Sequence, residues 1–263
     1  MSKYDTSDLG VELKDFVATV EIQRPPHNFF DIDLIEQIAD TYSVLDGDND
    51  CRAIVLCAQG KNFCAGANFG GSDAGKVKDN SGGDLSNELY RQAVRVFRVQ
   101  KPVVAAVQGA AIGGGLGLAV SADFRVTCPE GRFSANFTKL GFHPGFGLTL
   151  TLPELVGKQR ASLMCLTSRR LKGDQAYEWG LADVLVPLEE VRSAAQALAA
   201  EMAGCAPLAV ISTRATLRHG FADRIARQTD HELAEQNGLR RTEDWAEGIK
   251  ATSERREPVF VGR

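Results

Sequence analysis

Two glycine-bearing turns are the part of this sequence whose residue types could support chemistry. The first turn covers 60–68 and follows an apolar run at 53–58; the second covers 109–117 and follows an apolar run at 102–107. The second turn leads directly into a predicted helix, and such an entry exposes backbone N–H groups beside the positive end of the helix dipole. Two such turns on neighbouring strands can direct two N–H groups at one oxygen, as an oxyanion hole does. The alternative is that the glycines serve only tight packing or positive-φ turns.

Several common catalytic and cofactor motifs are absent. A dinucleotide-binding Gly-x-Gly-x-x-Gly pattern fails because Leu118 and Val120 stand where its last glycine would be. There is also no phosphate-binding Walker sequence, no His-Glu-x-x-His and no Gly-x-Ser-x-Gly. The six cysteines form no Cys-x-x-Cys pair. We therefore expect no metal and no permanently bound cofactor, and we expect the cysteines to be buried thiols.

Composition and charge indicate a soluble globular protein without nucleic-acid or membrane partners. The chain is 44% hydrophobic and 24% charged, with a net charge of −4, and its arginines cluster only in pairs. The segment 102–122 has no charged residue and is long enough to span a membrane, but its glycine and alanine content favours a buried strand-turn-helix. The polar segment 1–10 lacks the pattern of a secretory signal, so we expect a cytoplasmic protein.

Hydrophobic patterning divides the chain into three parts: a flexible N-terminus at 1–10, an α/β core at 11–187 and an all-helical region at 188–263. The expected strands are 16–22, 53–58, 102–107, 124–127 and 184–186. The expected helices of the last part are 188–203, 207–219, 223–239 and 243–252.

Local signals within these parts predict a helix start, a helix end and a lid. Asp33 and Glu36 have the spacing of a capping box for a helix near 34–45. Gly204 is suited to end the first helix of the last part. The glycine-rich stretch 70–83 is predicted to be a functional loop.

Several motifs together resemble the crotonase (enoyl-CoA hydratase/isomerase) family. The longest is Lys-Pro-Val-Val-Ala-Ala-Val-Gln-Gly-Ala-Ala-Ile-Gly-Gly-Gly at 101–115 and its continuation to Asp123. The others, in the same order as in the family, are Gly-Lys-x-Phe-Cys-Ala-Gly-Ala at 60–67, Leu-Gly-x-x-Pro-Gly-x-Gly-x-Thr at 140–149, Gly-Leu-Ala-Asp at 180–183 and the tail at 250–258.

The resemblance implies a spiral core of ββα units with a C-terminal all-helical trimerisation region, assembled as a homotrimer or a dimer of trimers. It implies an acyl-CoA substrate, with coenzyme A as part of that substrate. The thioester oxygen would be held by the N–H groups of Ala67 and Gly114. The matching positions for substrate or CoA contact are Cys64, Ala65, Gly66, Asn68, Phe69, Gly113, Phe137 and His27. For His27, a surface loop role is the alternative.

The match fails at the acid/base pair. Hydratases of the family use two glutamates to place and activate water, and the corresponding positions here are Gly117 and Phe137. Neither side chain can transfer a proton, so ordinary two-glutamate hydration is not expected. His143 is a tentative replacement base, because imidazole titrates near about pH 6.5. The alternative is a histidine that only fills the turn before Pro144.

The sequence thus predicts an enzyme of the hydratase/isomerase type, a lyase or isomerase of fatty acid metabolism, that stabilises an enolate-like oxyanion. Decarboxylation, retro-aldol cleavage or C–C hydrolysis are alternatives, because a substrate can supply its own leaving group. A non-catalytic CoA-thioester-binding protein is the alternative from another functional class.

Overall fold

The computed structural model describes residue 4 and the ranges 6–67 and 84–263, with the side chains of 84–86 excepted. The predicted contact residues Asn68 and Phe69 and the predicted lid at 70–83 lie outside the described residues.

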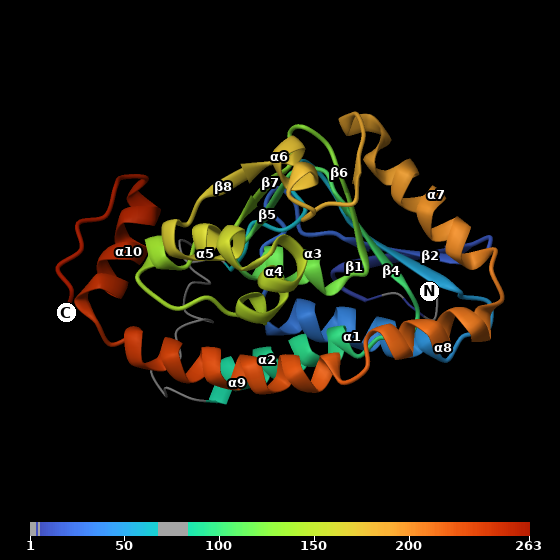
Figure 1. Cartoon of the computed structure of the whole chain (residues 1–263), viewed down its shortest axis with the longest axis horizontal. Coiled ribbons are helices and arrows are strands. Elements are labelled where there is room, and N and C mark those ends of the chain that lie inside the picture. The colour runs from blue at the N-terminus through green and yellow to red at the C-terminus, as the bar shows by residue number, and fades with distance from the viewer. Residues whose placement is uncertain (1–3, 5, 68–83) are drawn as a thin grey trace.

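A six-stranded sheet forms the centre of the molecule (Figure 1). Its order is β1-β2-β3-β4-β6-β9; β1 and β2 form an antiparallel hairpin, and each later strand runs parallel to its neighbour. The strands are β1 Leu9–Lys14, β2 Val17–Ile22, β3 Ala53–Ala58, β4 Val103–Val107, β6 Phe124–Thr127 and β9 Val184–Leu185. Every residue of β3 and β4 is buried, as expected for continuous apolar strands covered on both faces.

A second sheet of three short strands adjoins the first. It contains β5 Ala110–Ile112, β7 Arg132–Ser134 and β8 Arg170–Lys172, in that order. The chain passes from β4 to β5 through Gly109, where a Cβ atom would overlap the carbonyl oxygen of Lys61. This position therefore requires glycine, and the close approach brings the two glycine turns together.

Helices cover both faces of the main sheet (Figure 1). The helices are α1 Ile32–Asp46, α2 Asp84–Phe97, α3 Gly114–Ser121, α4 Leu148–Val156, α5 Lys158–Thr167, α6 Gly173–Glu178, α7 Val191–Ala203, α8 Pro207–Leu217, α9 Phe221–Leu239 and α10 Glu243–Glu254. Short 3-10 turns occur at Thr138–Leu140 and Leu188–Glu190. One core joins the sheet to α1, α2 and α3, and a second core joins the opposite face to α7.

Of two local predictions about helix ends, one is wrong and one is confirmed. The N-cap of α1 is Asp31, whose side chain accepts a hydrogen bond from the Leu34 amide at 3.0 Å, so Asp33 and Glu36 do not form the predicted box. Helix α7 ends at Gly204 as predicted, with a right-handed φ of −75° that does not require glycine.

The C-terminal helices pack on the core of their own chain. Helix α7 contributes Val191, Ala195, Ala199 and Ala203 to the core between itself and the main sheet. Helix α9 lies along α2 and also reaches α4 (Figure 1). A role of this region in oligomerisation stays a prediction. Within the described chain, no single helix could cross a membrane by length and composition, and only the bent pair Leu188–Ala203 and Pro207–Leu217 passes that test.

Candidate active site

The two glycine turns lie side by side. Cys64 and Ala111 form a parallel bridge, in which the Cys64 amide donates to Ala110 at 2.8 Å and the Ile112 amide donates to Cys64 at 3.0 Å. A Cβ atom on Gly115 would overlap the Cys64 carbonyl, so glycine allows the closest approach. Backbone hydrogen bonds between the two glycine turns therefore confirm the expectation that they lie next to each other.

The amides of Ala67 and of Gly114, the first residue of α3, have no acceptor among the described residues. They share this property with other amides of the two turns, such as that of Gly115. The Gly113 amide, by contrast, donates to the Ser134 carbonyl at 2.8 Å, and the Gly117 amide donates to the Gly113 carbonyl at 3.1 Å. A first-turn helical amide has no intrahelical partner, so the Gly114 donor is available to an oxygen outside the helix.

Phenylalanine rings surround the second turn. The Phe30 ring lies where a Cβ atom on Gly114 would be, and the Phe137 ring is 3.8 Å from the corresponding point on Gly113. Phe137 is 7% exposed and packs edge-on against Phe142, with ring centroids 5.3 Å apart. The second of the two glutamate positions thus holds a ring in an apolar wall.

Phe146 fills the space beside Gly117, the first of the two glutamate positions. A Cβ atom on Gly117 would lie 2.6 Å from the Phe146 Cβ atom and 2.6 Å from its ring. Phe146 is 1% exposed and adopts a left-handed backbone with φ of 61°. Phe146 lies on the central loop, residues 141–147, between the 3-10 turn and α4. Because its Cβ atom is fixed to the backbone, any side chain at 117 requires this central loop to move.

His143 lies on the same loop, half-buried. Its Nδ1 atom is 2.8 Å from the carbonyl oxygen of Pro144, and its ring stands edge-on to that of His231 on α9, with centroids 6.1 Å apart. Both contacts join the imidazole to its own loop and to α9, and its role as a base stays a prediction.

Comparison with known proteins gives the chain a family. A family model described as enoyl-CoA hydratase/isomerase matches residues 12–263. The chain belongs to the enoyl-CoA hydratase/isomerase family. It is 35% identical over 235 residues to a Mycobacterium tuberculosis protein named probable enoyl-CoA hydratase, covering 89% of this chain and 90% of the relative. It is 28% identical over 250 residues to 1,2-epoxyphenylacetyl-CoA isomerase of Escherichia coli, covering 94% and 95%.

Solved structures confirm the fold class predicted from the motifs. An enoyl-CoA hydratase/isomerase from Pseudoalteromonas atlantica has a TM-score of 0.86 at 26% identity, covering 97% of this chain and all of its own. A protein from Mycobacterium abscessus, named a probable enoyl-CoA hydratase/isomerase, has a TM-score of 0.74 at 32% identity, covering 97% of this chain and 99% of its own.

The other residues predicted to contact the substrate differ in their burial and in their backbone conformation. His27 is exposed, and its carbonyl accepts the Ala65 amide at 3.0 Å. The Cys64 side chain is fully buried in the core, and this burial raises the pKa of its thiol to about 12. Gly66 has φ of 92°, a conformation that favours glycine, and its carbonyl accepts the Phe30 amide at 3.1 Å. The structure leaves their contact with substrate as a prediction.

The cysteine prediction is correct for four of six residues. Cys51, Cys57, Cys64 and Cys128 are buried, whereas Cys165 is half-buried and Cys205 is exposed. Cys205 lies just after α7, where the chain turns at the surface towards α8. Among the described residues, no group of three or more His, Cys, Asp or Glu side chains could hold a metal ion.

Glu232 and Gln236 of α9 hold the central loop, and sequence reasoning missed both. The Glu232 carboxylate, fully buried, accepts the amide of Gly147 at 2.8 Å and the amide and hydroxyl of Thr149 at 3.0 and 2.5 Å. Burial raises the pKa of this carboxyl above its usual range. Gln236 donates to the His143 carbonyl at 2.9 Å. Their spacing of four residues on one helix face was the available signal.

Proposed function

We propose that this chain is an enzyme that binds an acyl-CoA thioester and stabilises an enolate-like oxyanion with the amides of Ala67 and Gly114. The observation that carries the proposal is the pair of adjacent turns whose two amides have no acceptor among the described residues. Two preorganised N–H donors suit a carbonyl oxygen that gains negative charge in a transition state. Membership of the hydratase/isomerase family supports a CoA thioester as the substrate class, with coenzyme A bound only as part of it.

The reaction we propose does not depend on two glutamates. Phe146 occupies the space beside Gly117, and Phe137 stands at the second position within an apolar wall. This arrangement leaves no carboxylate at either position to activate water. It supports double-bond isomerisation, or cleavage in which the substrate supplies its own leaving group, such as decarboxylation or retro-aldol cleavage. His143 remains our candidate for a base.

The donor function of Gly114 can be tested by a matched pair of variants. Gly114→Pro removes the N–H group, whereas Gly114→Ala keeps it, and both introduce the same Cβ atom against Phe30. Gly114 is the first residue of α3, a position that tolerates proline. We expect turnover of the best thioester to be about 10²–10³-fold lower in Gly114→Pro than in Gly114→Ala. Equal turnover would remove this amide from the mechanism.

The substrate is found by incubating the protein with a panel of acyl-CoA thioesters and identifying products by mass spectrometry. The panel includes enoyl-, β-hydroxyacyl-, β-ketoacyl- and malonyl-type thioesters, so that each proposed reaction has a substrate. Thioester binding without any product would favour the non-catalytic binding protein instead. His143→Ala, with His219→Ala as an exposed control, tests the base. Undiminished turnover in His143→Ala would exclude it.

We also propose a homotrimer or a dimer of trimers, located in the cytoplasm. Leu208 and Leu217 on α8 are 80% and 81% exposed, which supports an apolar contact with a second chain. Light scattering after size exclusion measures the assembly. A monomer at micromolar concentration would contradict it.

A further inference from the structure

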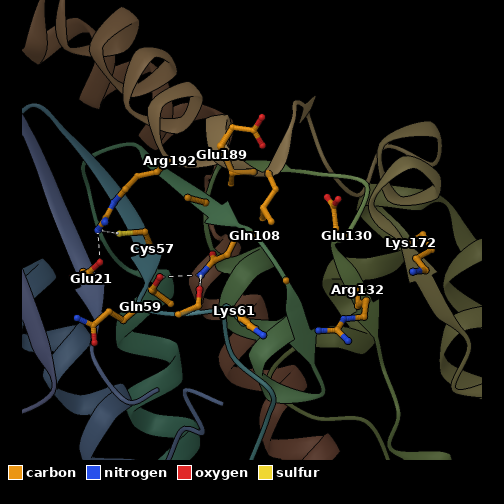
Figure 2. A pocket seen from close by; sticks show the side chains of 16 residues that line it. Glu21, Cys57, Gln59, Lys61, Gln108, Glu130, Arg132, Lys172, Glu189 and Arg192 are labelled. Atoms are coloured by element: carbon orange, nitrogen blue, oxygen red, sulfur yellow. Dashed lines mark hydrogen bonds and ion pairs between the residues drawn. The ribbon is translucent and has the colours of Figure 1, made fainter. Parts of the chain in front are cut away.

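A pocket of about 760 Å³ lies at the carboxyl ends of β3 and β4, on the sheet face that α7 covers (Figure 2). Cys57 and Ala106 line it, and both belong to the core between the sheet and α7. Helix α3, which begins at Gly114, belongs to the core on the opposite face. The pocket and the proposed oxyanion site therefore lie on different faces of the main sheet, although Lys61 at the start of the first glycine turn reaches the pocket.

Three basic side chains of this pocket have no carboxylate partner among the described residues: Lys61, Arg132 and Lys172. In contrast, Arg192 is already paired with Glu21 at 2.5 Å. Within the described part of the chain, the guanidinium of Arg132 donates to the Asn62 side chain at 3.0 Å, and its buried Nε atom has no acceptor there. The described residues thus form no ion pair with these three cations, in a lining that also carries Glu21, Glu130 and Glu189.

The backbone brings two of these cations together. The Arg132 amide donates to the Gly109 carbonyl at 2.9 Å, and Gly109 lies directly against the Lys61 backbone. Figure 2 shows the Lys61 and Arg132 side chains pointing towards one another, with Glu130 and Glu189 higher in the view. Two like charges held close together repel each other, and a bound anion would relieve this repulsion.

We propose that this pocket binds a small molecule bearing a phosphomonoester, with the phosphate between Lys61 and Arg132. A phosphate offers several strong acceptor oxygens to the planar fork of an arginine and to an ammonium group. The volume of the pocket lies within the range of small-molecule sites, which leaves room for the rest of the ligand beyond the phosphate. The carboxylates of Glu130 and Glu189 disfavour further negative charge there, and the side chains of Leu188 and Val191 favour an uncharged body.

The first measurement is calorimetric titration of the protein with inorganic phosphate, AMP and adenosine. We expect saturable binding of one phosphate and one AMP per chain, and none of adenosine, because the phosphate carries the recognition. Phosphate binding as tight as AMP binding would identify free phosphate as the ligand; tighter AMP binding would identify a phosphorylated metabolite. No saturable binding of either phosphate compound up to about 10 mM would overturn the proposal.

Substitutions place the binding in this pocket. Arg132→Gln and Lys172→Gln should each weaken phosphate binding by about tenfold, or 1.4 kcal/mol. Glu130→Gln should tighten it by about threefold, a gain that damage to the fold cannot imitate. Lys158→Gln, an exposed lysine on α5, serves as the control. Equal affinity in all four variants would refute the site.

The phosphate site and the proposed thioester chemistry can fail separately. Lys172→Gln should leave turnover of the thioester panel unchanged while it weakens phosphate binding. Neither butyryl-pantetheine nor butyryl-CoA, which carries the 3′-phosphate of coenzyme A, should displace phosphate from the protein. Displacement by either compound would show that the bound phosphate shares the proposed thioester site, and would overturn the separate pocket.

Discussion

The contact between Gly117 and Phe146 predicts that Gly117→Ala destabilises the protein when the Phe146 side chain is present and stabilises it when that side chain is removed. A Cβ atom at position 117 would meet Phe146 at 2.6 Å, so Gly117→Ala overpacks a core in which Phe146 is 1% exposed. Overpacking of this kind costs about 1–3 kcal/mol. Replacement of a glycine inside a helix by alanine gains about 0.5–1 kcal/mol, and Gly117 lies within α3. We therefore expect Gly117→Ala to destabilise the protein by about 0.5–2 kcal/mol.

Removal of the whole Phe146 side chain, its Cβ atom included, should reverse that sign. Phe146→Gly alone should cost about 3–5 kcal/mol, because it opens a cavity in the core, while the left-handed φ of 61° at this position suits glycine. In that background the Cβ atom of Gly117→Ala has free space, so only the helical gain remains, and the second substitution should stabilise by about 0.5–1 kcal/mol. The coupling energy of the double-mutant cycle is then about 1–3 kcal/mol.

Urea unfolding at one protein concentration measures all four proteins, because assembly makes the apparent stability depend on concentration. Gly238→Ala in α9 is the matched control: nothing lies within 4 Å of its added Cβ atom, so it should stabilise slightly in both backgrounds. If Gly117→Ala has the same effect with and without the Phe146 side chain, that side chain is not what excludes another from the first glutamate position.

Three further predictions concern single carboxylates and thiols. Burial raises the pKa of the Glu232 carboxyl, so its contribution to the free energy of unfolding should be complete below about pH 4.5 and should be lost as pH rises through the raised pKa. Urea unfolding measured across pH should show this loss in the wild type and in the exposed control Glu235→Gln, but not in Glu232→Gln. Asp123→Asn should destabilise by about 1–3 kcal/mol in thermal unfolding, because the carboxylate accepts from two arginines that end α8, each at 2.8 Å; a change within error would contradict this. A thiol reagent should label Cys205 rapidly and Cys64 only on unfolding, and fast modification of both would show that the first glycine turn opens.

Patterns in the sequence predicted the central strands well and the second sheet not at all. Strand β3 begins and ends where a continuous apolar run does, because a strand buried on both faces leaves that signature, and β6 also has its predicted bounds. Strands β5, β7 and β8 have three residues each, too few for a period of two to be recognised. The hairpin partner β1 was missed because its burial alternates only weakly.

The candidate site shows the same division between local and tertiary information. Glycine spacing predicted the adjacent turns, because a position that requires a small residue shows that requirement directly as a glycine in the sequence. The role of Phe146 could not be predicted in this way. It depends on a left-handed backbone at 146 and on a helix nearly thirty residues earlier in the chain. The absence of a side chain at 117 was visible, but the ring that fills the space was not.

The aromatic rings also bear on the kind of reaction that the two amides would serve. With Phe30, Phe137 and Phe146 around the second turn, the surroundings of the Gly114 amide are apolar. A low local dielectric strengthens a hydrogen bond from a fixed N–H group to a developing oxyanion, and it raises the free energy of an isolated carboxylate that must stay charged. Two glutamates would be costly there, whereas a substrate that loses a carboxylate as its enolate forms would gain. Among the proposed reactions, decarboxylation therefore fits the rings and the amides together.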